Sequence, residues 1–437
     1  MLFKIDSPKI VIEAADVVSD GRLLRQKRLV VENGILRSME NGTTPSNSLV
    51  LPTGVDCQVH LRVPGQEEKE DAETGSQAAL AGGIAAVLAM PNTNPTLDSP
   101  EVIAATRRTL DEASSRWGCS LLLSGAISKG LRSEEPVDFF GCARAGAIAF
   151  TDDGVGVMND EIMRCAFRAS ADLGIPILQH AEMMGHGGTL APGKFQRLSG
   201  VMPYHHDIEA AMVERDLKIL SEFPKARYHV LHVSSARTLD LIRRAKDQGF
   251  NVTCEVTPHH LHFCADDIDG ENTSFKMNPP LRGQSDREAL RMALGEGLID
   301  FVASDHAPHE QRSKTANFQT SSYGTTELET LLPALLALVN DGKLTIERLV
   351  EVFSSAPARL LGIPAPTVNV GKPFQAVVID DPWKSRTVDI DQMYSKSKNC
   401  VFIGKSLPGT VSKIFGSWQG RWFAYENNCE VYRSDRL

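Results

Sequence analysis

The sequence predicts an α/β protein: a (β/α)8 TIM barrel with a small β-sandwich domain formed from both termini. Two observations predict the barrel. Eight short apolar runs alternate with helix-like segments through the middle of the chain, and nearly every run ends in a cluster of polar side chains. In a closed barrel all strand ends meet at one mouth, whereas in an open sheet they would spread along an edge. The polar clusters therefore favour a barrel.

The predicted strands and helices follow one another along the chain. The apolar runs are residues 49–61, 84–91, 120–127, 145–150, 176–180, 227–235, 250–256 and 299–304. Amphipathic segments between them predict helices at 99–114, 207–223 and 236–249, with Asp, Ser or Pro near their starts. The number of strand and helix pairs and the chain length agree with a (β/α)8 barrel.

The two ends of the chain have a different pattern. Residues 1–48 predict short strands around a VVENGIL turn, and residues 366–437 contain the β-like runs AVVID, NCVFIG and RWFAYE. Neither end alone would make a stable sheet. We therefore expect one small β domain from residues 1–50 plus 366–437, beside a barrel from residues 51–365.

Composition excludes several classes of protein. The 437 residues carry a net charge of −9 with no basic run, which argues against a nucleic-acid partner. The longest uncharged apolar stretch, residues 78–90, is too short and glycine-rich to cross a bilayer. The eight cysteines are scattered without a C-x-x-C pair, which is typical of reduced buried thiols. The amino-terminal segment is charged and unlike a signal peptide, so we expect a cytoplasmic protein.

The first polar cluster is DCQVHLR, at the end of the first predicted barrel strand. Alternation along a strand places Asp56, Gln58, His60 and Arg62 on one face, toward the barrel interior. Four polar side chains among apolar core residues indicate a functional site rather than packing.

Three further strands end in candidate ligands. Asp152 and Asp153 close the fourth strand in FTDDG, and His180 and His232 close the fifth and sixth. An Asp pair before Gly is commonly a turn, and a single histidine is commonly structural. Two histidines on adjacent strands beside an acidic pair favour a metal site.

The last cluster is SDHAPH, at the end of the eighth strand. Asp305 can be both a metal ligand and a proton acceptor. His306 and His309 are less certain, because His306 points the other way if the strand continues. Two histidines and a bridging carboxylate suit a divalent ion, with Zn2+ first. No G-x-S-x-G motif is present, so an acyl-enzyme route is not expected.

These segments together resemble the amidohydrolase superfamily, and within it the dihydroorotases of the long-chain bacterial type. The likeness covers nearly the whole chain. The segments that carry it are VDCQVHLRVPGQEEKED, AMPNTNPT, FTDDG, QHAE, HVSSART, EVTPHH, MNPPLR, SDHAPH and GTTELETLLP.

The resemblance implies a reaction and a role for each site residue. The reaction is the reversible hydrolysis of L-dihydroorotate to N-carbamoyl-L-aspartate in pyrimidine synthesis, by a metal-bound hydroxide with Asp305 as general base. The implied metal ligands are His60 and Asp305 for the first ion, His180 and His232 for the second, and Asp153 as the bridge. The implied substrate-binding residues are Arg62, Asn92, Asn278 and His309, with the backbone at Tyr323 and Gly324.

A hydantoinase- or allantoinase-like cyclic amidase is a second possibility within the superfamily. Those relatives carry a carbamylated lysine at the end of the fourth strand, where this chain has AIAFTDDG and no lysine. Arg62 and Asn92 also suit a substrate carboxylate, because a guanidinium binds it in fork geometry. Both features favour dihydroorotate over hydantoin or allantoin.

Gln58 departs from the D-x-H-x-H pattern of the family, because it stands where the first histidine belongs. An amide oxygen is a poorer zinc ligand than imidazole, so we expect a weakened first metal site. Two hypotheses follow. The chain is either an enzyme with one tight and one weak metal, or a subunit of low activity that partners aspartate transcarbamoylase. We expect a homo-oligomer, and residues 310–324 form either a mobile lid or an ordinary exposed loop.

Overall fold

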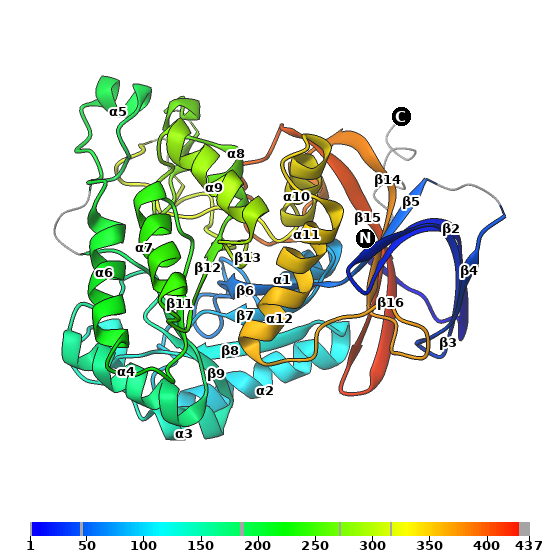
Figure 1. Ribbon diagram of the computed structural model, residues 1–437, viewed down its shortest axis with the longest axis horizontal. Helices are drawn as coiled ribbons and strands as arrows, with labels where there is room; N and C mark the ends of the chain where they lie inside the picture. Colours follow the sequence, from blue (N-terminus) through cyan, green and yellow to red (C-terminus); the bar gives the residue numbers. More distant parts are fainter. Residues whose placement is uncertain (1, 44–46, 184–187, 271, 315–316, 428–437) are drawn as a thin grey trace.

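The computed structural model describes residues 2–43, 47–183, 188–270, 272–314 and 317–427 (Figure 1). Its strands form two sheets of eight strands each. One sheet contains the middle of the chain, and the other contains strands from both ends. The predicted fold class is confirmed. The exact residue boundaries of the two parts stay a prediction.

The middle sheet is a parallel barrel whose strands follow chain order from β6 to β13. Its strands are β6 (Gly54–Val59), β7 (Ile84–Ala89), β8 (Ser120–Gly125), β9 (Ala147–Thr151), β10 (Ile177–Gln179), β11 (Tyr228–Val230), β12 (Val252–Val256) and β13 (Phe301–Val302). The barrel closes where Val59 forms a parallel bridge with His306 and the His60 N–H donates to the His306 carbonyl at 2.9 Å. All eight strand ends therefore meet at one mouth.

Helices surround the barrel (Figure 1). They are α1 (Ala72–Ala81), α2 (Pro100–Trp117), α3 (Phe139–Ala145), α4 (Asp160–Leu173), α5 (Lys194–Ser199), α6 (Ile208–Leu220), α7 (Ala236–Asp247), α8 (Pro258–His262), α9 (Gln284–Glu296), α10 (Leu331–Asn340), α11 (Ile346–Val350) and α12 (Ala356–Leu361). The three helices expected from the sequence are α2, α6 and α7, and all three are confirmed. Ser99 and Gly118 show why α2 has its bounds: the Ser99 hydroxyl caps the first turn, and Gly118 ends the helix at φ 83°.

The second sheet joins strands from the two ends of the chain. Its order is β1 (Leu2–Lys4), β16 (Arg421–Asn427), β15 (Ser406–Trp418), β14 (Ala376–Thr387), β5 (Ser48–Pro52), β2 (Lys9–Ser19), β3 (Arg22–Glu32) and β4 (Ile35–Asn41). Asn33 and Gly34 form the tight turn between β3 and β4, both at positive φ, as the VVENGIL pattern indicated. The sheet has its own buried apolar cluster, which includes Leu29, Phe374 and Phe415.

Two expectations about strands need correction. The run 49–61 is not one strand, because it divides at Thr53 into β5 of the terminal sheet and β6 of the barrel. The run NCVFIG, residues 399–404, forms turns and no strand. Its polar groups bond to the barrel mouth instead: the Asn399 amide donates to the carbonyls of Ala307 and Gly324, both at 3.0 Å. Contacts with distant parts of the chain outweigh its local β-propensity.

The helices and cysteines of the described residues agree with two expectations drawn from composition. None of these helices is both long and apolar enough to cross a membrane. The seven cysteines in this part of the chain are all free thiols, and most are buried.

Candidate metal centre

Asp56 and Gln58 on β6 are the innermost polar side chains of the mouth. Both are fully buried, and burial raises the pKa of Asp56 to about 7. The Asp56 carboxylate accepts from the Gln58 N–H at 3.2 Å and from the Ser304 N–H at 3.1 Å. Asp56 therefore connects β6 to the segment after β13 and helps to position the residues that follow these two strands.

Three side chains from consecutive strand ends converge on one point. Asp153 follows β9, His180 follows β10 and His232 follows β11, and all three are buried. Asp153 Oδ1 lies 3.6 Å from His180 Nδ1 and 3.7 Å from His232 Nε2, and the two ring nitrogens are 2.9 Å apart. Two imidazoles and a carboxylate in this arrangement are a typical zinc donor set.

The orientation of His180 shows that this point favours a cation. Its Nε2 lies 3.1 Å from Glu182 Oε2, so this nitrogen donates a proton there and Nδ1 faces Asp153 and His232. Burial alone would lower the pKa of His180, but hydrogen bonds to Asp153 and Glu182 raise it to about 10. Burial would raise the pKa of Asp153, yet His180 and His232 hold it well below its usual range. A positive charge between these groups is strongly stabilised, and the residues fit a divalent ion.

The other half of the cluster consists of His60 and Asp305, which approach the far oxygen of Asp153. His60 Nε2 lies 3.2 Å from Asp153 Oδ2 and 3.2 Å from Asp305 Oδ1. His60 Nδ1 lies 2.9 Å from the Asn92 amide oxygen, which can only accept, so Nδ1 donates and Nε2 is left to face the carboxylates. Asp153 is therefore in contact with both halves, as a bridging carboxylate would be.

Gln58 belongs to this half of the cluster, but it has an amide where the family pattern has a histidine. Its Nε2 donates to Asp153 Oδ1 at 3.1 Å, and a carboxylate oxygen can accept but not donate. The NH2 group of the amide must therefore face the cluster. The Gln58 carbonyl oxygen is buried and has no hydrogen-bond partner. This half offers one imidazole where the family pattern has two.

Backbone conformation marks the site independently of its side chains. Arg62, His232 and Asp305 have φ angles of 60°, 30° and 46°, in the left-handed region that residues with a Cβ rarely adopt. Such conformations persist where surrounding structure enforces them, commonly at functional sites. Strand alternation beyond Val59 therefore fails as a guide, because β6 ends there and Arg62 is placed by this turn.

Arg62 and His309 lie in contact at the mouth. Arg62 Nε donates to the Pro308 carbonyl at 3.3 Å, and its Nη2 donates to His309 Nε2 at 3.4 Å. Burial, followed by the charge of Arg62, lowers the pKa of His309 to about 2, so the ring is neutral. Its buried Nδ1 has no hydrogen-bond partner. The pair offers a guanidinium and a neutral imidazole, which are suited to binding a carboxylate.

The remaining candidate residues lie around the same mouth. Asn278 Nδ2 donates to Glu182 Oε2 at 2.5 Å and lies 3.2 Å from His180 Nε2. Asn92 faces His60 rather than Arg62. Gly324 packs against Ala307 and His309, and Tyr323 has a side chain 41% exposed. Their substrate roles stay predictions.

Glu182 was not singled out from the sequence, although it belongs to the QHAE segment. It is held at 3.1 Å from His180 Nε2, and hydrogen bonds and charge from His180 keep its pKa low despite burial. Two other residues are structural. Asp152 accepts from the Ile127 and Ser128 N–H groups at 2.7 and 3.0 Å. His306 lies 3.2 Å from Glu70 and accepts from the Glu327 N–H, away from the cluster.

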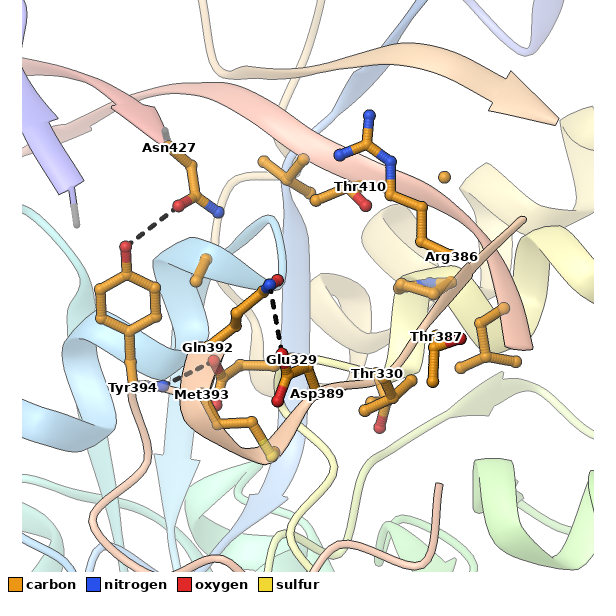
Figure 2. Close-up of a pocket in the computed structure, with 16 residues that line it drawn as sticks. Glu329, Thr330, Arg386, Thr387, Asp389, Gln392, Met393, Tyr394, Thr410 and Asn427 are labelled. Carbon is orange, nitrogen blue, oxygen red and sulfur yellow. Dashed lines mark hydrogen bonds between the residues drawn. The ribbon is translucent and has the colours of Figure 1, made fainter. Parts of the chain in front are cut away.

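A separate cavity of about 110 Å³ lies between α10 and strands β14 and β15 (Figure 2). Its lining includes Glu329, Arg386, Asp389 and Tyr394 but no histidine. Glu329 accepts from the Tyr394 N–H at 2.8 Å and the Ser395 N–H at 3.2 Å, so its carboxylate serves the local backbone. None of the metal-ligand candidates lines this cavity.

The fold and the buried cluster define a hydrolase that uses metal at the mouth of a barrel. Residues 49–423 match the family model described as Amidohydrolase family. A dihydroorotase from Brevibacillus brevis is 40% identical over 408 residues, which cover 90% of this chain and 95% of that protein. A dihydroorotase from Bacillus caldolyticus is 38% identical, over 88% of this chain and 92% of its own length. The chain therefore belongs to the amidohydrolase family, and within it to the dihydroorotases.

Solved structures with the same fold include relatives of the alternative class. The L-hydantoinase from Arthrobacter aurescens has a TM-score of 0.80 at 26% identity, covering 92% of this chain and 94% of its own. A D-hydantoinase has a TM-score of 0.79 at 19% identity, covering 96% and 97%, which shows the fold alone. The sequence relatives are closer, so the expectation of a metal-dependent cyclic amidohydrolase of the dihydroorotase group is confirmed.

Proposed function

We propose that this chain catalyses the reversible hydrolysis of L-dihydroorotate to N-carbamoyl-L-aspartate in pyrimidine synthesis. The observation that carries the proposal is the cluster of Asp153, His180 and His232, whose ligand atoms all lie within 4.8 Å of one another. The dihydroorotases quoted above support the substrate. A divalent ion held by these residues would supply an activated water and polarise the ring amide.

The residues of the chain supply the other parts of the reaction. His60 Nε2 contacts both Asp153 Oδ2 and Asp305 Oδ1. From this position the Asp305 carboxylate can take the proton of the attacking water. The same group then returns the proton to the leaving ring nitrogen. Arg62 and His309 bind the substrate carboxylate, and Asn92 and Asn278 also contact the substrate. The backbone at Tyr323 and Gly324 contacts the ring, so orientation contributes to the rate.

The two metal positions should differ in affinity. We assign the tight position to Asp153, His180 and His232, and the weak one to His60 and Asp305 beside Gln58. Zn2+ fits the imidazole-rich half best. The Gln58 NH2 group already donates to Asp153, and an amide nitrogen that carries two hydrogens has no lone pair for a metal.

A subunit of low activity that partners aspartate transcarbamoylase is the second candidate function, and Gln58 is the observation that favours it. Activity is the better supported function because the other implied ligands, His60, Asp153, His180, His232 and Asp305, lie close together at the barrel mouth. For the active enzyme we propose a homo-oligomer working in the cytoplasm.

Turnover tests the proposal directly. The purified protein is loaded with Zn2+, Co2+ or Mn2+, and dihydroorotate hydrolysis is compared with that of hydantoin and dihydrouracil. We expect dihydroorotate to be the preferred substrate. Preference for hydantoin or dihydrouracil would instead assign the chain to the hydantoinase-like cyclic amidases. Absence of turnover with every metal, together with co-purification of a transcarbamoylase, would instead support the inactive subunit.

A further inference from the structure

The turn at Tyr323 and Gly324 fits tightly against the barrel mouth. Gly324 donates from its N–H to the Lys276 carbonyl at 2.8 Å and accepts from the Asn399 amide at 3.0 Å. Its φ is 132°, and a Cβ there would come within 2.7 Å of the Ala307 carbonyl oxygen. The backbone at Gly324 is therefore held closely in place, as contact with a substrate ring would require.

One lysine of the same loop holds this turn from the other side. The Lys314 ammonium donates to three backbone carbonyls: Ser322 at 2.9 Å, Gly324 at 2.9 Å and Lys276 at 3.3 Å. An ammonium has three hydrogens, so all its donors are used. Two of these carbonyls, those of Ser322 and Gly324, flank Tyr323, and the third lies two residues before Asn278. A single side chain thus connects two segments that face the substrate.

Lys276 strengthens the same arrangement. It is 2% exposed, donates to the Gln319 carbonyl at 2.8 Å and the Ser321 carbonyl at 2.6 Å, and lies 4.4 Å from the centre of the Tyr323 ring. Burial, followed by the charge of Lys276, lowers the pKa of Lys314 to about 7, so the side chain is fully a three-donor ammonium only below that pH. Placing two cations side by side against backbone carbonyls costs desolvation energy, so packing alone does not account for them. Both side chains donate to backbone carbonyls within residues 319–324, so together they fix that segment.

We propose that Lys314 is a positioning residue for substrate binding, which fixes the Tyr323–Gly324 backbone relative to Asn278. The inference rests on the proposed hydrolysis of dihydroorotate. None of the three hydrogen bonds of Lys314 goes to a metal-ligand candidate. Its loss should therefore raise KM much more than it changes kcat, and the metal content should stay the same.

The first test uses Lys314→Met, which keeps the length of the apolar stem and removes the three donors. We expect KM for dihydroorotate to rise on the order of tenfold, because hydrogen bonds from a charged group are lost. Arg312→Met is the matched control, since it removes a cation from the same loop whose side chain is 78% exposed. It should leave KM unchanged. Lys314→Arg should be intermediate, because a planar guanidinium cannot point at three converging carbonyls. An unchanged KM in Lys314→Met would overturn the proposal.

A second measurement does not depend on turnover. Hydrogen exchange of the metal-loaded protein, read on a peptide covering residues 318–326, reports the Gly324 N–H that is bonded to Lys276. Lys314→Met should exchange this amide faster, while Arg312→Met should match the parent protein. Unchanged protection in Lys314→Met would contradict the positioning role. If the parent protein fails to hydrolyse dihydroorotate, the proposed function fails, and exchange still decides whether Lys314 fixes the turn.

Discussion

The two halves of the metal centre share Asp153 but differ in what surrounds their ligand atoms. His180 and His232 bring two ring nitrogens within 2.9 Å of each other and within 3.7 Å of Asp153, and Glu182 fixes the His180 ring from behind. On the other side only His60 brings an imidazole, while Gln58 directs an NH2 group at the bridging carboxylate. The half with His180 and His232 is therefore suited to hold a cation. In the other half, the Gln58 NH2 group already donates a hydrogen bond to the Asp153 carboxylate.

Loss of one imidazole leaves the group of Asp153, His180 and His232 intact. Gln58 donates to the same oxygen that faces His180 and His232. A carboxylate oxygen has a second lone pair, so this bond restrains Asp153 and leaves the oxygen able to bind a cation. A hydrophobic residue there would leave Asp153 less constrained. The substitution is therefore compatible with one tight ion and an intact proton acceptor at Asp305.

The largest effect should come from removing one ligand of the tight metal position, which consists of Asp153, His180 and His232. His232→Ala is expected to lose the tight ion and to lower kcat/KM by on the order of a thousandfold, because a metal contributes several kcal/mol to the transition state. Metal analysis after dialysis and the dihydroorotate assay measure both. Arg243→Ala, which changes a side chain 49% exposed on α7, is the control and should change neither. Retained metal and rate in His232→Ala would refute the assignment of the tight site.

The next largest effect separates proton transfer from metal binding. Asp305→Asn keeps the size of the side chain and removes the proton acceptor. We expect kcat to fall by on the order of 10²–10⁴-fold, the usual contribution of a general base, while the tight ion remains bound. Equal metal content with a much reduced kcat is the supporting result. Loss of the tight ion along with activity would mean that Asp305 serves the complete half instead.

Much of the site followed from where polar residues stand relative to strands. His180 and His232 were found because each follows an apolar run, and the parallel barrel brings such positions together. Strand alternation also placed Asp56 and Gln58 correctly inside the barrel. The choice of Asp153 over Asp152 came from resemblance, and the structure gives its physical reason. The oxygens of Asp152 are taken by N–H groups of Ile127 and Ser128.

What the sequence could not give depends on contacts between distant segments. Glu182 lies past the end of β10, where alternation no longer sets the direction of a side chain, so its contact with His180 was missed. The run 399–404 has the composition of a strand, yet Asn399 bonds to Ala307 and Gly324, about 75 to 92 positions earlier in the chain. Neither pairing leaves a local pattern in the sequence.

A smaller effect should follow from weakening the contact between Glu182 and His180, a ligand of the tight metal position. Glu182→Gln removes the charge that holds the His180 N–H and should weaken the tight ion by roughly 10–100-fold, the usual cost of losing an outer partner of a metal-bound histidine. Competition with a chelator measures this affinity. Glu161→Gln, whose side chain is 78% exposed, is the matched control. An unchanged affinity would show that Asn278 or the backbone orients His180 without Glu182.

Gln58→His should have the smallest effect on turnover. It also tests most directly whether Gln58 is the reason that the two metal positions differ. An imidazole at this position can present a lone pair to a metal, which the NH2 group of Gln58 cannot. We expect bound Zn2+ to rise from about one to about two ions per chain. Activity should rise only modestly, because the tight ion and Asp305 already operate. Gln77→His on α1, away from the mouth, controls for the added histidine and should bind no further ion. With Mn2+, two neighbouring ions would also give a spin-coupled EPR signal that one ion cannot. A metal content that stays at one ion per chain would show that Gln58 is not the only residue that keeps an ion from the position of His60 and Asp305. The contact between His60 and Asp305 would then be the next one to change.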